Sequence, residues 1–62
     1  MKRVDLIRHL KDHGCELLRE GGKHSFWINT VNGKRSPVPR HTEIKDTTAN
    51  GICKQLDIPK AS

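Results

Sequence analysis

Residues 15–39, CELLREGGKHSFWINTVNGKRSPVP, contain two turn sequences that separate three short segments. Gly21-Gly22 and Asn32-Gly33 favour the left-handed backbone conformations that tight reversals between antiparallel strands require. The segments between and beside these turns are short enough to be single strands. The stretch therefore predicts a three-stranded antiparallel meander, with strands at residues 15–20, 23–29 and 35–39.

The middle strand is the most apolar of the three, and the third strand is expected at an edge. Phe26, Trp27 and Ile28 all have high strand propensity. Neighbouring residues in a strand point to opposite faces, so only one of the two aromatic rings is expected in the core. Trp27 shares its face with polar residues, and we expect it to be the exposed ring, available to stack on a nucleic-acid base. Pro37 and Pro39 have no amide hydrogen to donate, which places the third strand at an edge of the sheet.

Amphipathic patterns on both sides of the meander predict two helices. Before the meander, residues 4–13 have apolar side chains at steps of three and four residues, at Val4, Leu6, Ile7 and Leu10. After it, a helix that begins near Asp46 and ends before Pro59 has the apolar stripe Ala49, Ile52, Cys53 and Leu56. Both stripes are buried most simply against one face of the sheet. We therefore predict an α+β fold with the order α-β-β-β-α, in which residues 1–62 form one domain.

The composition gives the chain a strong positive charge and a small core. Its 62 residues include 12 Lys and Arg against 7 Asp and Glu, for a net charge of +5, and 32% of them are hydrophobic. Such a charge favours polyanionic ligands, because Lys and Arg release counterions from a phosphate backbone. A solvated basic surface without a nucleic-acid ligand is the simpler alternative.

Cysteine content and hydropathy indicate a cytoplasmic protein. No long apolar stretch follows Met1, so we expect neither a secretion signal nor a membrane-spanning segment. Cys15 and Cys53 are far apart in the sequence, and in a reducing compartment both thiols are expected to be buried apolar groups. A disulfide between them is the open alternative.

Cationic and imidazole side chains concentrate in the second and third strands and just after them. They are Lys23, His24, Lys34, Arg35, Arg40 and His41. Strands two and three of a meander pair directly, so we expect His24 to lie near the cations at the end of the third strand. Metal-free RNA cleavage needs a base for the 2′-hydroxyl proton, an acid for the leaving 5′-oxygen and cations for the phosphate. An imidazole can take either proton-transfer role near neutral pH.

The competing interpretation of His24 is an ordinary polar residue without a chemical role. The alternation of the strand places it on the face of Phe26 and Ile28, which would bury it if those two side chains formed the core. His24 then stays accessible only if the strand begins at the rim of the sheet.

A metal site is the alternative chemistry, and the sequence does not favour it. His9, His13 and Cys15 lie close together in the chain, but no CxxC or HExxH pattern accompanies them. We therefore expect no metal ion and no cofactor.

The chain resembles the HicA toxins of bacterial toxin–antitoxin pairs over nearly its whole length. The residues that carry this resemblance are 14–19, Gly22-Lys23-His24 and Val38-Pro39-Arg40-His41. It implies a double-stranded-RNA-binding-domain-like fold, mRNA endonuclease activity, and a HicB-type antitoxin whose binding masks the active face. The catalytic residue of that family is a histidine in the second strand, which corresponds to His24. The chain departs from the family at Cys15, where an aromatic residue is common.

These observations lead to one main hypothesis and two alternatives. The main hypothesis is a toxin that cleaves mRNA without a metal, uses His24 as general acid or base, and is inhibited by a HicB-type antitoxin. The residues expected to bind RNA are Lys23, Lys34, Arg35, Arg40 and His41. The alternatives are a non-catalytic module that binds double-stranded RNA and an interaction protein whose basic surface serves only an acidic partner.

Overall fold

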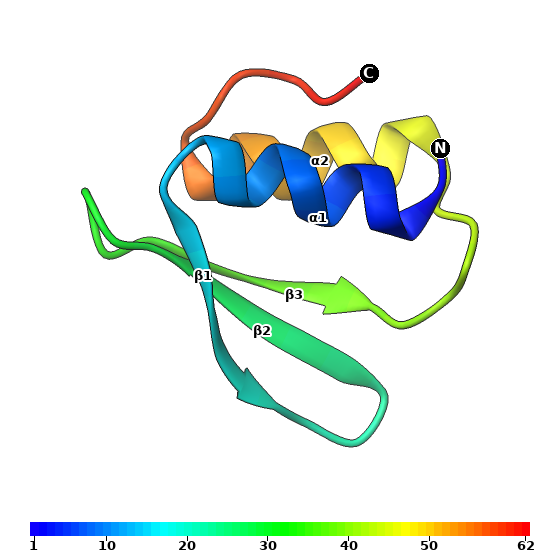
Figure 1. Cartoon of the computed structure of the whole chain (residues 1–62), viewed down its shortest axis with the longest axis horizontal. Helices are drawn as coiled ribbons and strands as arrows, with labels where there is room; N and C mark the ends of the chain where they lie inside the picture. The colour runs from blue at the N-terminus through cyan, green and yellow to red at the C-terminus, as the bar shows by residue number, and fades with distance from the viewer.

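The computed structural model describes all residues from 1 to 62 and has two helices on one face of a three-stranded antiparallel sheet (Figure 1). The elements in chain order are α1 (Arg3–Asp12), β1 (Cys15–Glu20), β2 (His24–Asn29), β3 (Arg35–Pro39) and α2 (Asp46–Leu56). The strand order is β1-β2-β3, so the expected meander and the expected edge position of β3 are confirmed. The α-β-β-β-α order confirms the fold class. None of the helices is both long and apolar enough to cross a membrane.

Helix α1 begins one residue earlier than the apolar pattern indicates. Lys2 precedes it in an extended conformation and forms an isolated β-bridge with Glu43. The amide of Arg3 donates to the carbonyl oxygen of Thr42 at 2.8 Å. A helix start leaves amide groups without intrahelical partners, and the chain before α2 supplies an acceptor here in place of a side-chain cap. The end of α1 follows the sequence, because Gly14 has a φ of +81° and stops the helix.

The hydrophobic core lies between the helices and one face of the sheet. Its apolar members are Leu6, Leu10, Cys15, Trp27, Val38, Ile44, Ala49, Ile52, Cys53 and Leu56. The predicted stripe of α2 is wholly buried, whereas Val4 at the start of the α1 stripe is exposed. Cys15 and Cys53 are free thiols, and burial raises the pKa of both.

The expectation that Trp27 is exposed is wrong. Only 4% of Trp27 is exposed, and Ser25 and Asn29 on the same face of β2 are equally buried. Their polar groups have partners inside the fold: Ser25 accepts a hydrogen bond from Arg3, and the Asn29 amide donates to the carbonyl oxygen of Leu56. The polarity of these neighbours therefore reflects satisfied buried groups rather than contact with solvent.

The burial of Trp27 leaves His24, Phe26 and Ile28 on the opposite face of β2, which no helix covers. The guanidinium of Arg19 lies 4.5 Å from the centre of the Phe26 ring, and Pro37 is the cross-strand partner of Phe26. A β-bulge between Leu17 and Arg19 shifts the register of β1 so that Arg19 lies opposite Phe26. This open face extends along the β1–β2 hairpin, which projects beyond the helices (Figure 1).

We predict that the fold tolerates little loss from its small core. Leu10→Ala should lower the free energy of unfolding by about 2–5 kcal/mol, because Leu10 is fully buried and a cavity would replace it. Leu17→Ala removes the same atoms from a side chain that is 48% exposed, and should lower it by under about 1 kcal/mol. Urea unfolding followed by circular dichroism measures both. Equal losses in the two variants would contradict the position of the core.

Candidate functional site

His24 is exposed at the sheet end where β2 begins and β3 ends. It is the first residue of β2 and pairs with Pro39, the last residue of β3. Beside it lies a hollow of about 400 Å³, which we call the His24 hollow. Its lining residues come from β2, β3, the β3–α2 connection and α2: His24, Pro39, His41, Glu43, Ile44, Lys45 and Thr48. The position of His24 at the rim of the sheet keeps its imidazole accessible.

The His24 hollow combines two imidazoles with charges of both signs. Lys45 supplies an ammonium group and Glu43 a carboxylate. The Met1 ammonium lies 3.7 Å from Glu43 and donates hydrogen bonds to the Ile44 carbonyl oxygen and to Asp46. The hydrogen bond with Asp46 raises the pKa of the Met1 ammonium and lowers the pKa of the Asp46 carboxyl. A second positive charge therefore lies beside the hollow and faces its one carboxylate.

Arg40 is held by the turn that precedes His24. Its guanidinium donates hydrogen bonds to the carbonyl oxygens of Gly21 and Gly22, and it lies 3.0 Å from the Glu20 carboxylate. The Gly21 amide donates to the His24 carbonyl oxygen at 2.9 Å, which closes the same turn. The donors of Arg40 that were expected to bind a phosphate thus contact the protein itself. In this geometry Arg40 fixes the turn from which His24 extends.

Arg3 is a half-buried cation of the site that the sequence analysis missed. Its Nε donates to the Pro39 carbonyl oxygen at 2.9 Å, and one terminal nitrogen donates to the Ser25 hydroxyl oxygen at 3.1 Å. It therefore links the end of β3 to the residue next to His24. No local pattern signals this role, because the partners of Arg3 are 22 and 36 residues away in the chain.

The structure divides the expected cationic cluster into two groups. Lys23, His24, Arg40 and His41 lie at the end of the sheet where β2 begins, so the predicted proximity of His24 to the end of the third strand is confirmed. Arg35 lies at the other end of β3, about 13 Å along the strand from Pro39. Lys34 precedes Arg35, and its ammonium is 3.8 Å from the Asp57 carboxylate. Lys34 and Arg35 therefore do not line the His24 hollow.

His9 in α1 and His13 just after it form a separate pair that contacts backbone oxygens. The ring centres of His9 and His13 are 4.3 Å apart. His9 Nε2 is 2.7 Å from the Pro59 carbonyl oxygen, and His13 Nδ1 is 2.9 Å from the His9 carbonyl oxygen. No group of three or more His, Cys, Asp and Glu side chains is arranged to hold a metal ion.

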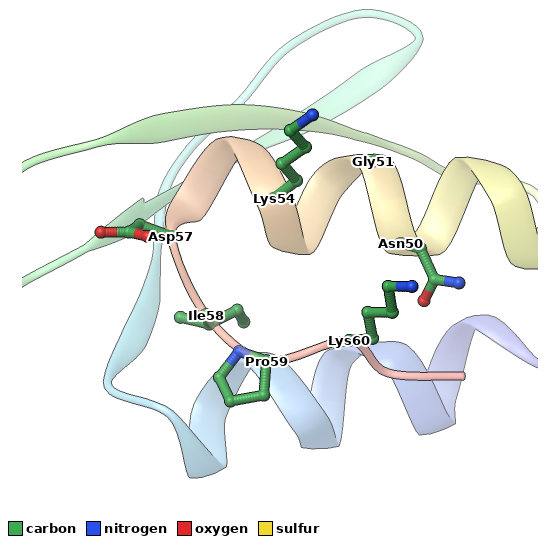
Figure 2. Close-up of a pocket in the computed structure, with 7 residues that line it drawn as sticks. All are labelled: Asn50, Gly51, Lys54, Asp57, Ile58, Pro59 and Lys60. Atoms are coloured by element: carbon green, nitrogen blue, oxygen red, sulfur yellow. The ribbon is translucent and has the colours of Figure 1, made fainter.

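A larger hollow of about 460 Å³ lies between α2 and the C-terminal tail (Figure 2). Its lining residues are Asn50, Gly51, Lys54, Asp57, Ile58, Pro59 and Lys60. None of these residues carries an imidazole or a thiol, and Lys54 points away from the tail (Figure 2). The hollow lacks a group suited to proton transfer near neutral pH, and the His24 hollow is therefore the better candidate site.

In the comparison with protein families, residues 4–58 match the model described as HicA toxin of bacterial toxin-antitoxin. Comparisons with curated proteins and with solved structures found no significant match. The matched range includes every helix and strand apart from the first residue of α1, and it contains His24, Arg40 and His41.

We predict that Arg40→Ala loosens the turn before His24. Loss of its hydrogen bonds should speed hydrogen exchange of the Gly21 amide by about 3- to 10-fold, which corresponds to the ~0.5–1.5 kcal/mol net contribution of a typical hydrogen bond. Lys23→Ala removes a neighbouring cation that makes no contact of this kind and should leave the exchange rate unchanged. Amide exchange followed by NMR makes the comparison, and an unaltered Gly21 rate in Arg40→Ala would show that Arg40 does not hold the turn.

Proposed function

The chain belongs to the HicA family of toxins of bacterial toxin–antitoxin systems, and from this premise we propose that it is a metal-independent endoribonuclease that cleaves mRNA in the cytoplasm. The observation that carries the proposal is the exposed imidazole of His24, which lines a hollow together with a second imidazole and a lysine. Such a combination supplies the proton transfers and the positive charge that cleavage of a phosphodiester needs.

The proposed reaction uses the 2′-hydroxyl group of the RNA as the nucleophile. His24 acts as general base toward that hydroxyl or as general acid toward the leaving 5′-oxygen. Lys45 in the hollow and Lys23 beside His24 place the scissile phosphate and stabilise the charge that develops on it. Arg3 and Arg40 position the strand ends and the turn that hold His24.

The cations outside the His24 hollow have a different proposed role. Lys34 and Arg35 lie at the other end of β3, so they contact the RNA away from the scissile bond. His41 remains at the cleavage site because it lines the hollow with His24. Binding through these groups is sequence-independent and weakens as salt increases.

The proposed protein partner is a HicB-type antitoxin that inhibits the toxin. The family pairs a toxin with an antitoxin, and the net charge of +5 favours a partner with an acidic surface. An antitoxin that covers the His24 hollow would exclude RNA from the imidazoles and from the lysine together. One bound partner would then block both binding and cleavage.

We predict that His24→Ala reduces RNA cleavage by about 10²- to 10⁴-fold, the usual contribution of a general acid or base. RNA affinity should change little, since the cations remain. His13→Ala is the matched control, because it removes an exposed imidazole just after α1 that lies outside the hollow. The measurement is cleavage of labelled RNA in EDTA, with affinity determined on RNA that is 2′-O-methylated throughout.

Three results in EDTA separate this proposal from its alternatives. Unchanged cleavage by His24→Ala would remove His24 from the mechanism. Binding without any cleavage by the wild-type chain would exclude metal-independent cleavage and would support a non-catalytic double-stranded-RNA-binding module, or a metal nuclease that EDTA has silenced. Absence of salt-sensitive RNA binding would support a protein whose basic surface serves only an acidic partner.

In growing cells, expression of the wild-type chain should stop growth and fragment transcripts, because mRNA is the proposed substrate. Expression of His24→Ala to the same level should do neither. Co-expression of the HicB-type antitoxin should restore growth in the wild-type culture. Colony counts and transcript integrity are the measurements. If cells tolerate the two chains equally, a toxin that acts through His24 is contradicted.

A further inference from the structure

We propose that His41 is the second proton-transfer group of the cleavage site. When one of the two histidines acts as general base, the other acts as general acid; this inference rests on the ribonuclease function proposed above. The two imidazoles come from different parts of the fold, since His24 begins β2 and His41 lies between β3 and α2. Both line the His24 hollow. The hollow thus brings two imidazole-bearing residues from separate segments of the chain to one place.

The reaction requires two proton transfers at separate oxygens. The base takes the proton of the 2′-hydroxyl as the O2′–P bond forms, and the acid gives a proton to O5′ as the P–O5′ bond breaks. In an in-line displacement the entering and leaving oxygens lie on opposite sides of phosphorus. Two groups on different segments of the chain fit this geometry better than a single imidazole. The products are a 2′,3′-cyclic phosphate and a 5′-hydroxyl, and no net proton or electron is consumed.

The backbone on both sides of His41 is anchored. Arg40 before it holds the turn at Gly21 and Gly22 through its side chain. Thr42 after it accepts a hydrogen bond from the Arg3 amide. The His41 side chain itself is exposed and makes no hydrogen bond within the chain. The backbone that carries His41 is therefore held on both sides, while its ring nitrogens stay available to a substrate.

Other polar groups around the hollow are less suited to the second role. The Glu43 carboxylate lies 3.7 Å from the Met1 ammonium, so it is compensated by a positive charge. Lys45 supplies a positive charge for the phosphate, and Thr48 supplies a hydroxyl that can donate a hydrogen bond to it. Outside the hollow, Lys23 and Arg3 add positive charge near His24. These cations favour binding of the phosphate and leave the two imidazoles for proton transfer.

The test uses the full chain and compares His24→Ala, His41→Ala and the double variant on one RNA over a range of pH. The wild type should give a bell-shaped dependence of kcat/KM on pH, because one imidazole must be neutral and the other protonated. His41→Ala should lower kcat about 10²- to 10⁴-fold with KM changed by less than about threefold. Each single variant should lose one limb of the bell, and the two variants should lose opposite limbs.

A substrate with sulfur in place of the leaving 5′-oxygen identifies the acid. A thiolate leaves without protonation, so the variant that lacks the acid should regain about 10²-fold or more on this substrate, relative to the variant that lacks the base. His41→Gln keeps a polar side chain of similar size and checks that lost activity does not come from a disturbed fold, together with circular dichroism of each variant.

The outcomes separate the inference from the proposed function. If the wild type cleaves, His24→Ala does not and His41→Ala remains fully active, the inference about His41 is overturned while the ribonuclease proposal stands. If His41→Ala loses activity but keeps both limbs of the pH profile, His41 is a positioning residue and the inference is again overturned. If the wild type cleaves no RNA at any pH, the ribonuclease proposal itself is overturned.

Discussion

The burial of Trp27 against the two helices is the contact on which the rest of the structure depends. Side chains alternate along a strand, so a buried Trp27 forces His24 and Phe26 onto the opposite, open face of β2. Burial of 150–250 Å² of aromatic surface stabilises the fold by about 4–6 kcal/mol. The indole N–H of Trp27 has no hydrogen-bond partner, which costs about 1–3 kcal/mol. Hydrophobic burial outweighs that cost. Because Trp27 is buried on one face of β2, the other face is the one that stays accessible.

The candidate site depends on contacts between residues that are distant in the sequence. Arg3 links the start of α1 to the end of β3, and Arg40 links the end of β3 to the turn before β2. The Met1 ammonium contacts Glu43 in the β3–α2 connection and Asp46, the first residue of α2. These polar links lie at one end of the molecule, around the His24 hollow, while the apolar core lies between the helices and the sheet. The apolar core is small, and charged groups at its edge hold the segments that form the site.

The structure also shows how the positive charges are distributed over the fold. A net charge of +5 says only that polyanions are favoured ligands. The fold places one set of cations beside two imidazoles and another set at the far end of β3. The Arg40 guanidinium donates its hydrogen bonds to backbone oxygens of the protein itself. Charges that are equivalent in composition therefore differ in what they are able to contact.

The sequence by itself determined the order of elements, the positions of the two turns and the apolar stripe of α2, because these follow from turn residues or from side-chain period. The left-handed conformation expected at both turns occurs at Gly33, which has a φ of +75°, but not at Gly21 or Gly22. The resemblance to the family rests on particular residues rather than on these preferences, and the match to the family model over residues 4–58 confirms it. Only the tertiary structure decided which face of β2 is buried, because that choice depends on how well Ser25, Trp27 and Asn29 fit beneath the helices. It also decided the roles of Arg3 and Arg40, since their partners lie 18 to 36 residues away. Short-range patterns determine the structure of each segment, whereas packing and paired charges between distant segments determine which side chains lie at the His24 hollow.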